Sequence, residues 1–195
     1  MRRFLAEHSK LSLVTFFLGA SIVCFVVLTA IFAPIISPYS PNRIVGPQLA
    51  PPSNQFIMGT DTLGRDVLSR VLWGGRASLA VAIIATLLSM GVGSPLGALS
   101  GYFGGKLDTV LTSVMDTLYC FPCYILALLI AVILGPEATN ISIAVGISYI
   151  PEYFRVVRSI ALNIKEKTFI EAEKVLGASH FRIVFIHIMP YTLSS

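Results

Sequence analysis

The sequence predicts an all-α fold, a polytopic bundle of transmembrane helices, and its composition and charge pattern lead to this prediction. Only 12% of the residues are charged, whereas 55% are hydrophobic and the mean hydropathy is +0.81. Soluble domains carry about 25% charged residues. Long segments also lack charge, and a bilayer core about 30 Å thick needs roughly 20 apolar residues per helical crossing. We expect about four crossings, at residues 11–36, 77–105, 109–136 and 140–160.

The first crossing, residues 11–36, contains no charged residue. Arg2 and Arg3 precede it as in a secretory signal, but a signal-peptide core has only about 7–15 apolar residues, so we expect an uncleaved anchor. Basic residues gather on the cytoplasmic side of membrane proteins. Arg2, Arg3 and Lys10 therefore place residues 1–10 in the cytoplasm, and the basic stretch after the fourth crossing returns there. The net charge of +4 suits anionic membrane lipids and is no argument for a nucleic acid partner.

Residues 37–76 predict an extracytoplasmic loop that ends in an interfacial helix. Proline and asparagine are frequent in its first half, which has no run long enough for a helix. Thr60 or Asp61 can cap the helix that follows. Asp61 and Asp66 each precede an arginine by four residues, the favourable order for helical ion pairs. From these residues alone, we expect a helix that lies on the membrane surface.

The second crossing, residues 77–105, is rich in glycine. Small residues let helices approach closely in lipid, where packing rather than hydrophobicity drives helix association. We therefore expect this helix to be buried against other helices, with the close approach at Gly91, Gly93, Pro95, Gly97 and Gly101.

The third crossing, residues 109–136, contains one charged residue, Asp116. An ionisable residue inside a crossing is a functional hypothesis by default. We favour a structural pair or hydrogen bond over a proton or ion relay, although the sequence identifies no partner at matching depth. Asp108, near the cytoplasmic edge, is expected to cap a helix or pair there. Cys120 and Cys123 have the spacing of a redox pair, but no cationic residue near them in sequence would stabilise a thiolate, so we favour two small apolar fillers.

Residues 165–190 look like a soluble helix pair within an apolar chain. Thr168 and Glu171 fit a capping box at the start of one helix, and Gly177 is well placed to end it. Ser179 can cap a second helix. Two short helices joined at a glycine bend on the cytoplasmic side would present a compact knob to a soluble partner, and helix-in-groove docking is a common recognition mode for that shape.

The second of these helices is expected to end at Pro190. His180 and His187 share one face, but no carboxylate or cysteine near them in sequence completes a metal site, so we expect no metal. An apolar stripe at helical spacing predicts the buried face of this helix, made of Phe181, Val184, Phe185 and Ile188.

Two motifs resemble those of a known family. The run EAEKVLGASHFRIVFIHIMP resembles the EAA loop in the permease subunits of bacterial ABC importers. GTDTLGRDVLSR resembles the signature before the second crossing in the dipeptide/oligopeptide/nickel branch, and GYFGGKLD, LGPEATN and FRVVRS follow in that branch's order. The resemblance covers essentially the whole chain. The signature residues are Gly59, Thr60, Asp61, Gly64, Arg65, Asp66, Ser69 and Arg70.

The resemblance implies a transport subunit for peptides, nickel or related small solutes that does no covalent chemistry and needs no cofactor. In such importers the EAA loop forms a coupling helix in a groove of the cytoplasmic ATPase subunit. A second permease subunit completes the pathway, and an extracytoplasmic binding protein delivers the substrate. The residues that the resemblance assigns to ATPase coupling are Thr168, Glu171, Ala172, Lys174, Gly177, Ala178, Ile188 and Pro190.

The chain also departs from the family pattern. Glu173 stands where a second alanine is usual, Ser113 where an arginine is frequent, Met189 where leucine is usual and Tyr191 where asparagine is usual. Permeases of this branch usually continue with two further crossings after the EAA loop. Residues 77–195 therefore predict an incomplete permease domain, from a fragment or a naturally shortened protein, and we expect no transport by these 195 residues with their partners.

Two other functions stay open. A non-transporting membrane adaptor would use only the cytoplasmic knob to hold an ATPase, and an import assay separates it from a permease. A membrane thiol redox protein would use Cys120 and Cys123, and replacing both by serine would abolish its activity while barely affecting a permease.

Overall fold

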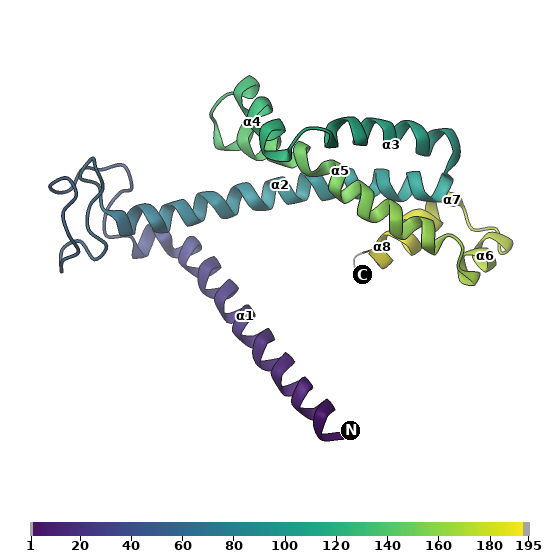
Figure 1. The fold of residues 1–195 in the computed structure, drawn as a ribbon, viewed down its shortest axis with the longest axis horizontal. Coiled ribbons are helices and arrows are strands. Elements are labelled where there is room, and N and C mark those ends of the chain that lie inside the picture. The colour runs from purple at the N-terminus through teal and green to yellow at the C-terminus, as the bar shows by residue number, and fades with distance from the viewer. Residues whose placement is uncertain (1, 193–195) are drawn as a thin grey trace. The chain divides into compact units, whose positions relative to one another are not determined.

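The structure is a computed structural model that describes residues 2–192, and the side chains of residues 13–192. Met1 and residues 193–195, at the ends of the expected segments, lie outside the described residues, as do the side chains of Arg2, Arg3 and Lys10. Within the described range the chain is helical, with two isolated β-bridges and no strand, so the predicted all-α fold class is confirmed. The helices are α1 (Arg2–Ile36), α2 (Val67–Phe103), α3 (Gly105–Tyr119), α4 (Cys123–Leu134), α5 (Ala138–Ile164), α6 (Thr168–Val175), α7 (His180–Arg182), the π-helix η1 (Ile183–Ile188) and α8 (Met189–Thr192) (Figure 1).

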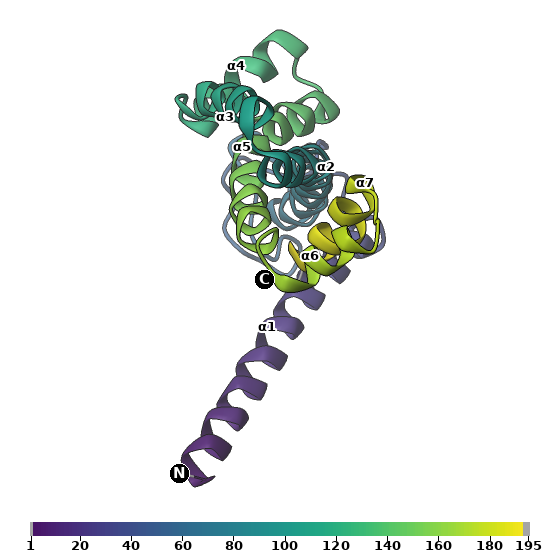
Figure 2. The same ribbon diagram turned by 90° about the vertical axis from the view of Figure 1, so that its right-hand side faces the viewer.

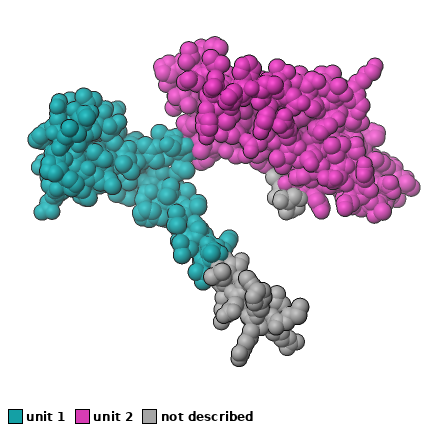
Figure 3. Space-filling model, viewed as in Figure 1, with its two compact units in different colours: residues 1–80 teal, residues 81–195 magenta. Residues whose placement is uncertain are grey.

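The chain divides into two compact units, residues 1–80 and 81–195 (Figure 3). The first contains α1, the loop between α1 and α2, and the start of α2. Two antiparallel bridges, Ile44–Arg65 and Thr60–Asp66, close that loop on itself. The second unit contains the rest of α2 and all the later helices.

Two of the described helices are long and apolar enough to cross a membrane, Leu13–Ile36 within α1 and the whole of α2. The pair of α3 and α4 makes a third if it counts as one crossing, but the two helices meet at 86°. The third expected crossing, residues 109–136, is therefore not one continuous helix. Pro122 explains the break, because proline lacks a backbone N–H and clashes with the preceding helical turn.

The fourth expected crossing, residues 140–160, lies in α5, which is a 27-residue helix. Among the described helices, α5 does not meet the length and composition criterion for a membrane span. Glu152, Arg155 and Arg158 make its second half polar. Length alone would let α5 cross a bilayer about 30 Å thick, since a helix rises 1.5 Å per residue.

In the second unit, α2 packs on α5 through glycines spaced four residues apart. A Cβ atom placed on Gly97 would lie 2.5 Å from the carbonyl oxygen of Phe154, and one on Gly93 or Gly101 would lie 2.7 Å from an α5 carbonyl oxygen. The predicted close approach is confirmed at these three glycines. It does not extend to Gly91, where a Cβ atom would meet nothing within 4 Å. Only glycine permits this backbone separation, in keeping with the role of small residues between membrane helices.

A cluster of buried hydrophobic residues in the second unit lies where α2 and α5 meet the C-terminal helices, which lie beside α5 in Figures 1 and 2. Fully burying one isoleucine side chain stabilises a fold by about 1.5–3 kcal/mol. The cluster therefore fixes the C-terminal helices to the long ones. Its buried members are Ala98, Tyr102, Val157, Ala161, Ile164, Ile170, Ile183, Val184 and Ile188.

Candidate functional site

The polar segment after α5 folds as the predicted helix pair, but its first helix starts differently. Thr168 is the first residue of α6, and Lys167 occupies the N-cap with extended backbone and no side-chain cap hydrogen bond. The carbonyl of Lys167 already accepts from the N–H groups of Ile170 and Glu171. The prediction of a capping box between Thr168 and Glu171 is therefore wrong, because the helix begins one residue too early for the threonine hydroxyl to cap it.

The turn after α6 is as predicted. Gly177 has a φ of 82°, in the left-handed region that favours glycine. Its N–H donates to the carbonyl of Lys174, and the N–H of Ala178 donates to that of Glu173. These two hydrogen bonds form a Schellman motif, which satisfies carbonyls at the end of a helix. The Ser179 hydroxyl then accepts from the N–H of Arg182 and caps α7, so both predicted helix-end roles are confirmed.

The second helix of the pair is only partly as predicted. Val184 and Ile188 are fully buried and Phe185 packs on the cluster, whereas Phe181 is 70% exposed and Ile183 is buried instead. The π-helix η1 explains the difference, because its i to i+5 hydrogen bonds shift the inward face along the chain. The prediction that Pro190 ends the unit is wrong, since α8 continues through it to Thr192.

The helix pair, which we call the knob (residues 168–188), is anchored on one side and free on the other. Ile170 of α6 is fully buried against the cluster on α5. At the other end of α6, Val175 is 88% exposed and Leu176 is 82% exposed. Ile170, Val175 and Leu176 are not among the predicted coupling residues. Of the predicted ones, Ile188 is buried and Ala178 half-buried, and the exposed ones are Thr168, Glu171, Ala172, Lys174, Gly177 and Pro190.

Tyr102, near the end of α2, links the knob to the membrane helices. Its hydroxyl lies 2.7 Å from Nδ1 of His180, and the Lys174 ammonium lies 5.5 Å from its ring centre. Within the knob, Nε2 of His187 lies 3.6 Å from the Glu173 carboxylate. Sequence reasoning missed the Tyr102–His180 and Glu173–His187 contacts, because 78 residues separate Tyr102 from His180 and the turn at Gly177 reverses the chain between Glu173 and His187.

The first part of the family signature, residues 59–66, folds as a cross-linked loop. Its last residues, Ser69 and Arg70, lie at the start of α2 rather than in a separate helix on the membrane surface. Asp61 accepts from the backbone N–H groups of Leu63 and Arg65, and its carboxylate pairs with the side chains of both Arg65 and Arg70. The Arg65 N–H is the main cause that holds the pKa of Asp61 well below its usual range, helped by the Leu63 N–H and the Arg65 guanidinium and opposed by desolvation.

Asp66, and not Thr60 or Asp61, caps the helix that follows this loop. Its buried carboxylate accepts from both the N–H and the hydroxyl of Ser69, and α2 begins only at Val67. The predicted Asp66–Arg70 pair is therefore wrong, since the Asp66 carboxylate is used as a cap and Arg70 pairs with Asp61.

The remaining signature residues hold the loop's backbone. Thr60 accepts from the N–H of Ala50, and its hydroxyl donates to the carbonyl of Pro47. Gly59 and Gly64 have φ values of 72° and 74°, so side chains there would strain the backbone. The whole signature therefore supports the shape of the loop.

Two ion pairs join α3 to α5. Asp108 accepts from Nε and Nη2 of Arg158, at 2.6 Å each, and from the Ser100 hydroxyl. Asp116 accepts from Nη2 of Arg155 at 2.7 Å, and both of these side chains are about half exposed. The expected structural pair of Asp116 is present. Its partner, Arg155, lies in α5, and the sequence alone does not show that the two residues lie at the same depth in the membrane.

Cys120 and Cys123 lie at the break between α3 and α4. Both thiols are free, and Cys120 is exposed. The Cys123 thiol lies 3.9 Å from the hydroxyl of Tyr149, as a weak hydrogen-bond donor. Nothing in this arrangement pairs the two cysteines with each other.

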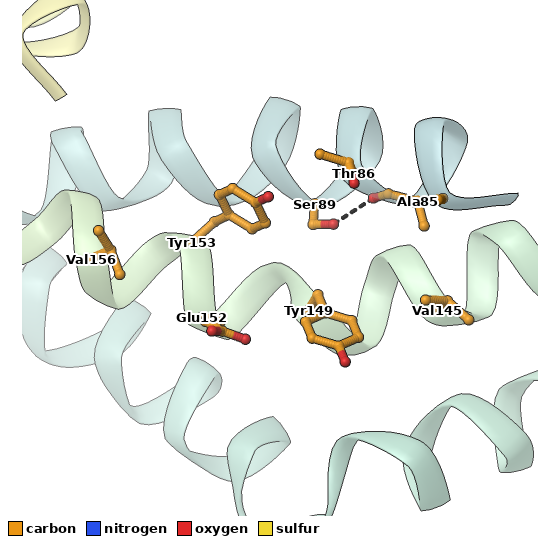
Figure 4. A pocket seen from close by; sticks show the side chains of 9 residues that line it. Ala85, Thr86, Ser89, Val145, Tyr149, Glu152, Tyr153 and Val156 are labelled. Carbon is orange, nitrogen blue, oxygen red and sulfur yellow. Dashed lines mark hydrogen bonds between the residues drawn. The ribbon is translucent and has the colours of Figure 1, made fainter. Parts of the chain in front are cut away.

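A cavity of about 460 Å³ lies between α2 and α5. Figure 4 shows Tyr149, Glu152 and Tyr153 along α5, beside the turn of α2 that carries Thr86 and Ser89. A second cavity, of about 220 Å³, lies at the break between α3 and α4, and Glu152 lines it too.

Comparison with known proteins gives a consistent picture. Residues 93–195, more than half of the chain, match the family described as binding-protein-dependent transport system inner membrane component. A dipeptide transport system permease of Haemophilus influenzae is 36% identical, over 91% of this chain and 62% of that protein. A glutathione transport system permease of Pectobacterium atrosepticum is also 36% identical, over 100% of this chain and 63% of that protein. A probable D,D-dipeptide transport system permease of Escherichia coli is 35% identical, over 90% of this chain and 59% of that protein. The chain thus spans about three fifths of the length of these relatives.

Proposed function

The chain belongs to the binding-protein-dependent transport system inner membrane component family, and from this premise we propose that it is a permease subunit of an ATP-driven importer for peptides or related small solutes. The relatives named above are dipeptide and glutathione permeases, and both substrates are small peptides. This supports peptides over the nickel that the sequence motifs alone also allowed.

We assign the coupling role to the knob. In this proposal the knob and the N-terminus lie in the cytoplasm, and α6 docks in a groove of the ATPase subunit. A binding protein delivers the substrate on the opposite side, and a second permease subunit completes the pathway within the membrane lipids. ATP-driven movement of the ATPase then reaches the membrane helices through the cluster around Ile170.

One observation carries this assignment. Val175 and Leu176 are 88% and 82% exposed at the tip of a helix whose Ile170 is fully buried. Adjacent exposed apolar side chains on a firmly anchored helix mark a protein interaction site, and a short helix of this kind suits a groove in a partner.

The test is to replace the tip and measure ATPase binding. The protein is purified in nanodiscs with the ATPase subunit of the same importer. We expect Leu176→Asp to weaken binding at least about tenfold, since burying an unpaired charge is unfavourable. Ile57→Asp is the matched control, because Ile57 is 64% exposed in the first unit, far from the knob in sequence. Equal ATPase binding by the wild type and both variants would contradict the assignment.

An adaptor that only holds the ATPase would pass the binding test. Import separates the two functions. Vesicles that contain the protein, its second permease subunit and the ATPase are supplied with the binding protein, a labelled dipeptide and ATP. ATP-dependent accumulation of the dipeptide would identify a permease and would overturn the expectation that these 195 residues do not transport. ATPase binding without accumulation would identify an adaptor.

A further inference from the structure

Glu152 is an uncompensated charge in the middle of α5. The two arginines that follow it along the helix are both paired, Arg155 with Asp116 and Arg158 with Asp108. Among the described residues, no ion pair or hydrogen bond involves the Glu152 carboxylate. Because the N-terminus and the knob are both proposed to lie in the cytoplasm, the proposal requires α5 to be a fourth crossing after α1, α2 and the α3–α4 pair. An ionisable side chain inside the membrane needs a partner or a water-filled space and marks a functional site.

The carboxylate of Glu152 opens on space rather than on packed side chains. It lines both the cavity between α2 and α5 and the cavity at the α3–α4 break, about 460 and 220 Å³. Small-molecule sites have volumes of about 300–1,000 Å³, so the larger cavity is in the range of a small ligand. Broken membrane helices with irregular backbone also recur at transport sites, and residues 120–122 form such a break beside Glu152.

The other lining groups of the larger cavity suit an organic cation. Tyr149 and Tyr153 line this cavity with Glu152, three residues before it and one residue after it along α5. Aromatic rings attract cations. Thr86 and Ser89 supply hydroxyl oxygens from α2 as further acceptors. Alanine and valine form the rest of the wall, which leaves room for small side chains. A carboxylate with two aromatic rings and hydroxyl oxygens is an environment for an ammonium group.

We propose that Glu152, with Tyr149 and Tyr153, binds the N-terminal ammonium group of a peptide as it passes through this subunit. This inference rests on the proposed function for its substrate class. The position of Glu152 between two cavities gives the ammonium group one fixed anchor, while the rest of the peptide occupies the larger cavity without specific contacts.

The first experiment measures import in the reconstituted vesicles described above. Where the vesicles import dialanine, we expect Glu152→Gln to raise the KM for dialanine at least about tenfold, because it removes the charge that pairs with the ammonium group. Where the wild type does not import, as expected for these 195 residues, the second experiment decides. Glu137→Gln is the matched control, since Glu137 occupies the N-cap position of the same helix without a side-chain cap hydrogen bond and lines neither cavity. Basal ATPase activity should be the same in all three proteins. Dialanine import by Glu152→Gln with an unchanged KM would overturn the inference and leave the proposed function intact.

The second experiment does not depend on transport. The protein in nanodiscs is treated with a carbodiimide, which modifies carboxyl groups, and modification of Glu152 is measured by mass spectrometry. We expect dialanine amide, which carries the ammonium group, to protect Glu152, and N-acetyldialanine amide to give no protection. Glu137 should be modified equally throughout. Protection without import would refute the proposed function alone, whereas equal modification of Glu152 with and without dialanine amide would refute the ammonium site.

Discussion

The contact between α2 and α5 at Gly97 gives the sharpest prediction of the structure. A Cβ atom on Gly97 would lie 2.5 Å from the Phe154 carbonyl oxygen, and ordinary contact needs about 3.4 Å. In Gly97→Ala the two helices must therefore separate by 3.4 − 2.5 = 0.9 Å at this point. A gap of 0.5–1 Å forfeits about a quarter to a half of the dispersion energy of each contact that opens.

We expect Gly97→Ala to be less stable than Gly91→Ala by about 1–3 kcal/mol, the usual effect of overpacking. Gly91 lies in the same helix and has nothing within 4 Å of an added Cβ atom. Alanine improves helix propensity by about 1 kcal/mol at either position, so this contribution cancels in the comparison.

The assay is unfolding of the purified protein in mixed micelles by added sodium dodecyl sulfate, followed by far-UV circular dichroism. The difference in free energy of unfolding between the two variants is the measured quantity. If the two variants agree within about 0.5 kcal/mol, the scatter usual for surface substitutions, Gly97 is not a contact point and the packing of α2 on α5 described above is wrong.

Three further predictions use the same unfolding assay. Asp108→Asn should lower the free energy of unfolding by about 1.5–3 kcal/mol, because it removes the charge and one of the two oxygens that accept from Arg158. Asp116→Asn, at a half-exposed pair, should change it by less than about 1 kcal/mol. Equal effects would contradict the geometry. Ile170→Ala should lower it by about 2–5 kcal/mol, and Phe169→Ala, at the half-exposed neighbour, by clearly less. The folded-state pKa of Asp61 is lowered, so the ionised Asp61 stabilises the fold fully above the ordinary pKa of 3.8, and this stabilisation is lost as the pH falls below that value. Asp61→Asn should therefore flatten the acid limb of the curve of unfolding free energy against pH. An unchanged acid limb would show that Asp61 does not cause it.

Local sequence patterns predicted those parts of the knob that depend on local backbone geometry. Gly177 ends α6 because only glycine adopts a φ of 82° without strain. The Ser179 hydroxyl caps α7 because it accepts a hydrogen bond from the N–H of Arg182, three residues later. Thr168 failed as a cap because a shift of one residue at a helix start changes which side chain is at the N-cap. Phe181 failed as a buried residue because a π-helix cannot be read from a pattern of 3.6-residue spacing.

The sequence by itself determined that this chain is an all-α membrane protein, since scarcity of charge and long apolar runs need no tertiary information. Its motifs also determined the family, which the comparison confirms. Only the tertiary structure decided that Arg155 neutralises Asp116 and that Tyr102 contacts His180. It also decided that Glu152 lines two cavities and is the one charged side chain of α5 without an ion-pair partner among the described residues. The physical reason is that helix faces and depths depend on how helices bend and pack, as at Pro122, and packing joins residues whose separation in sequence carries no signal.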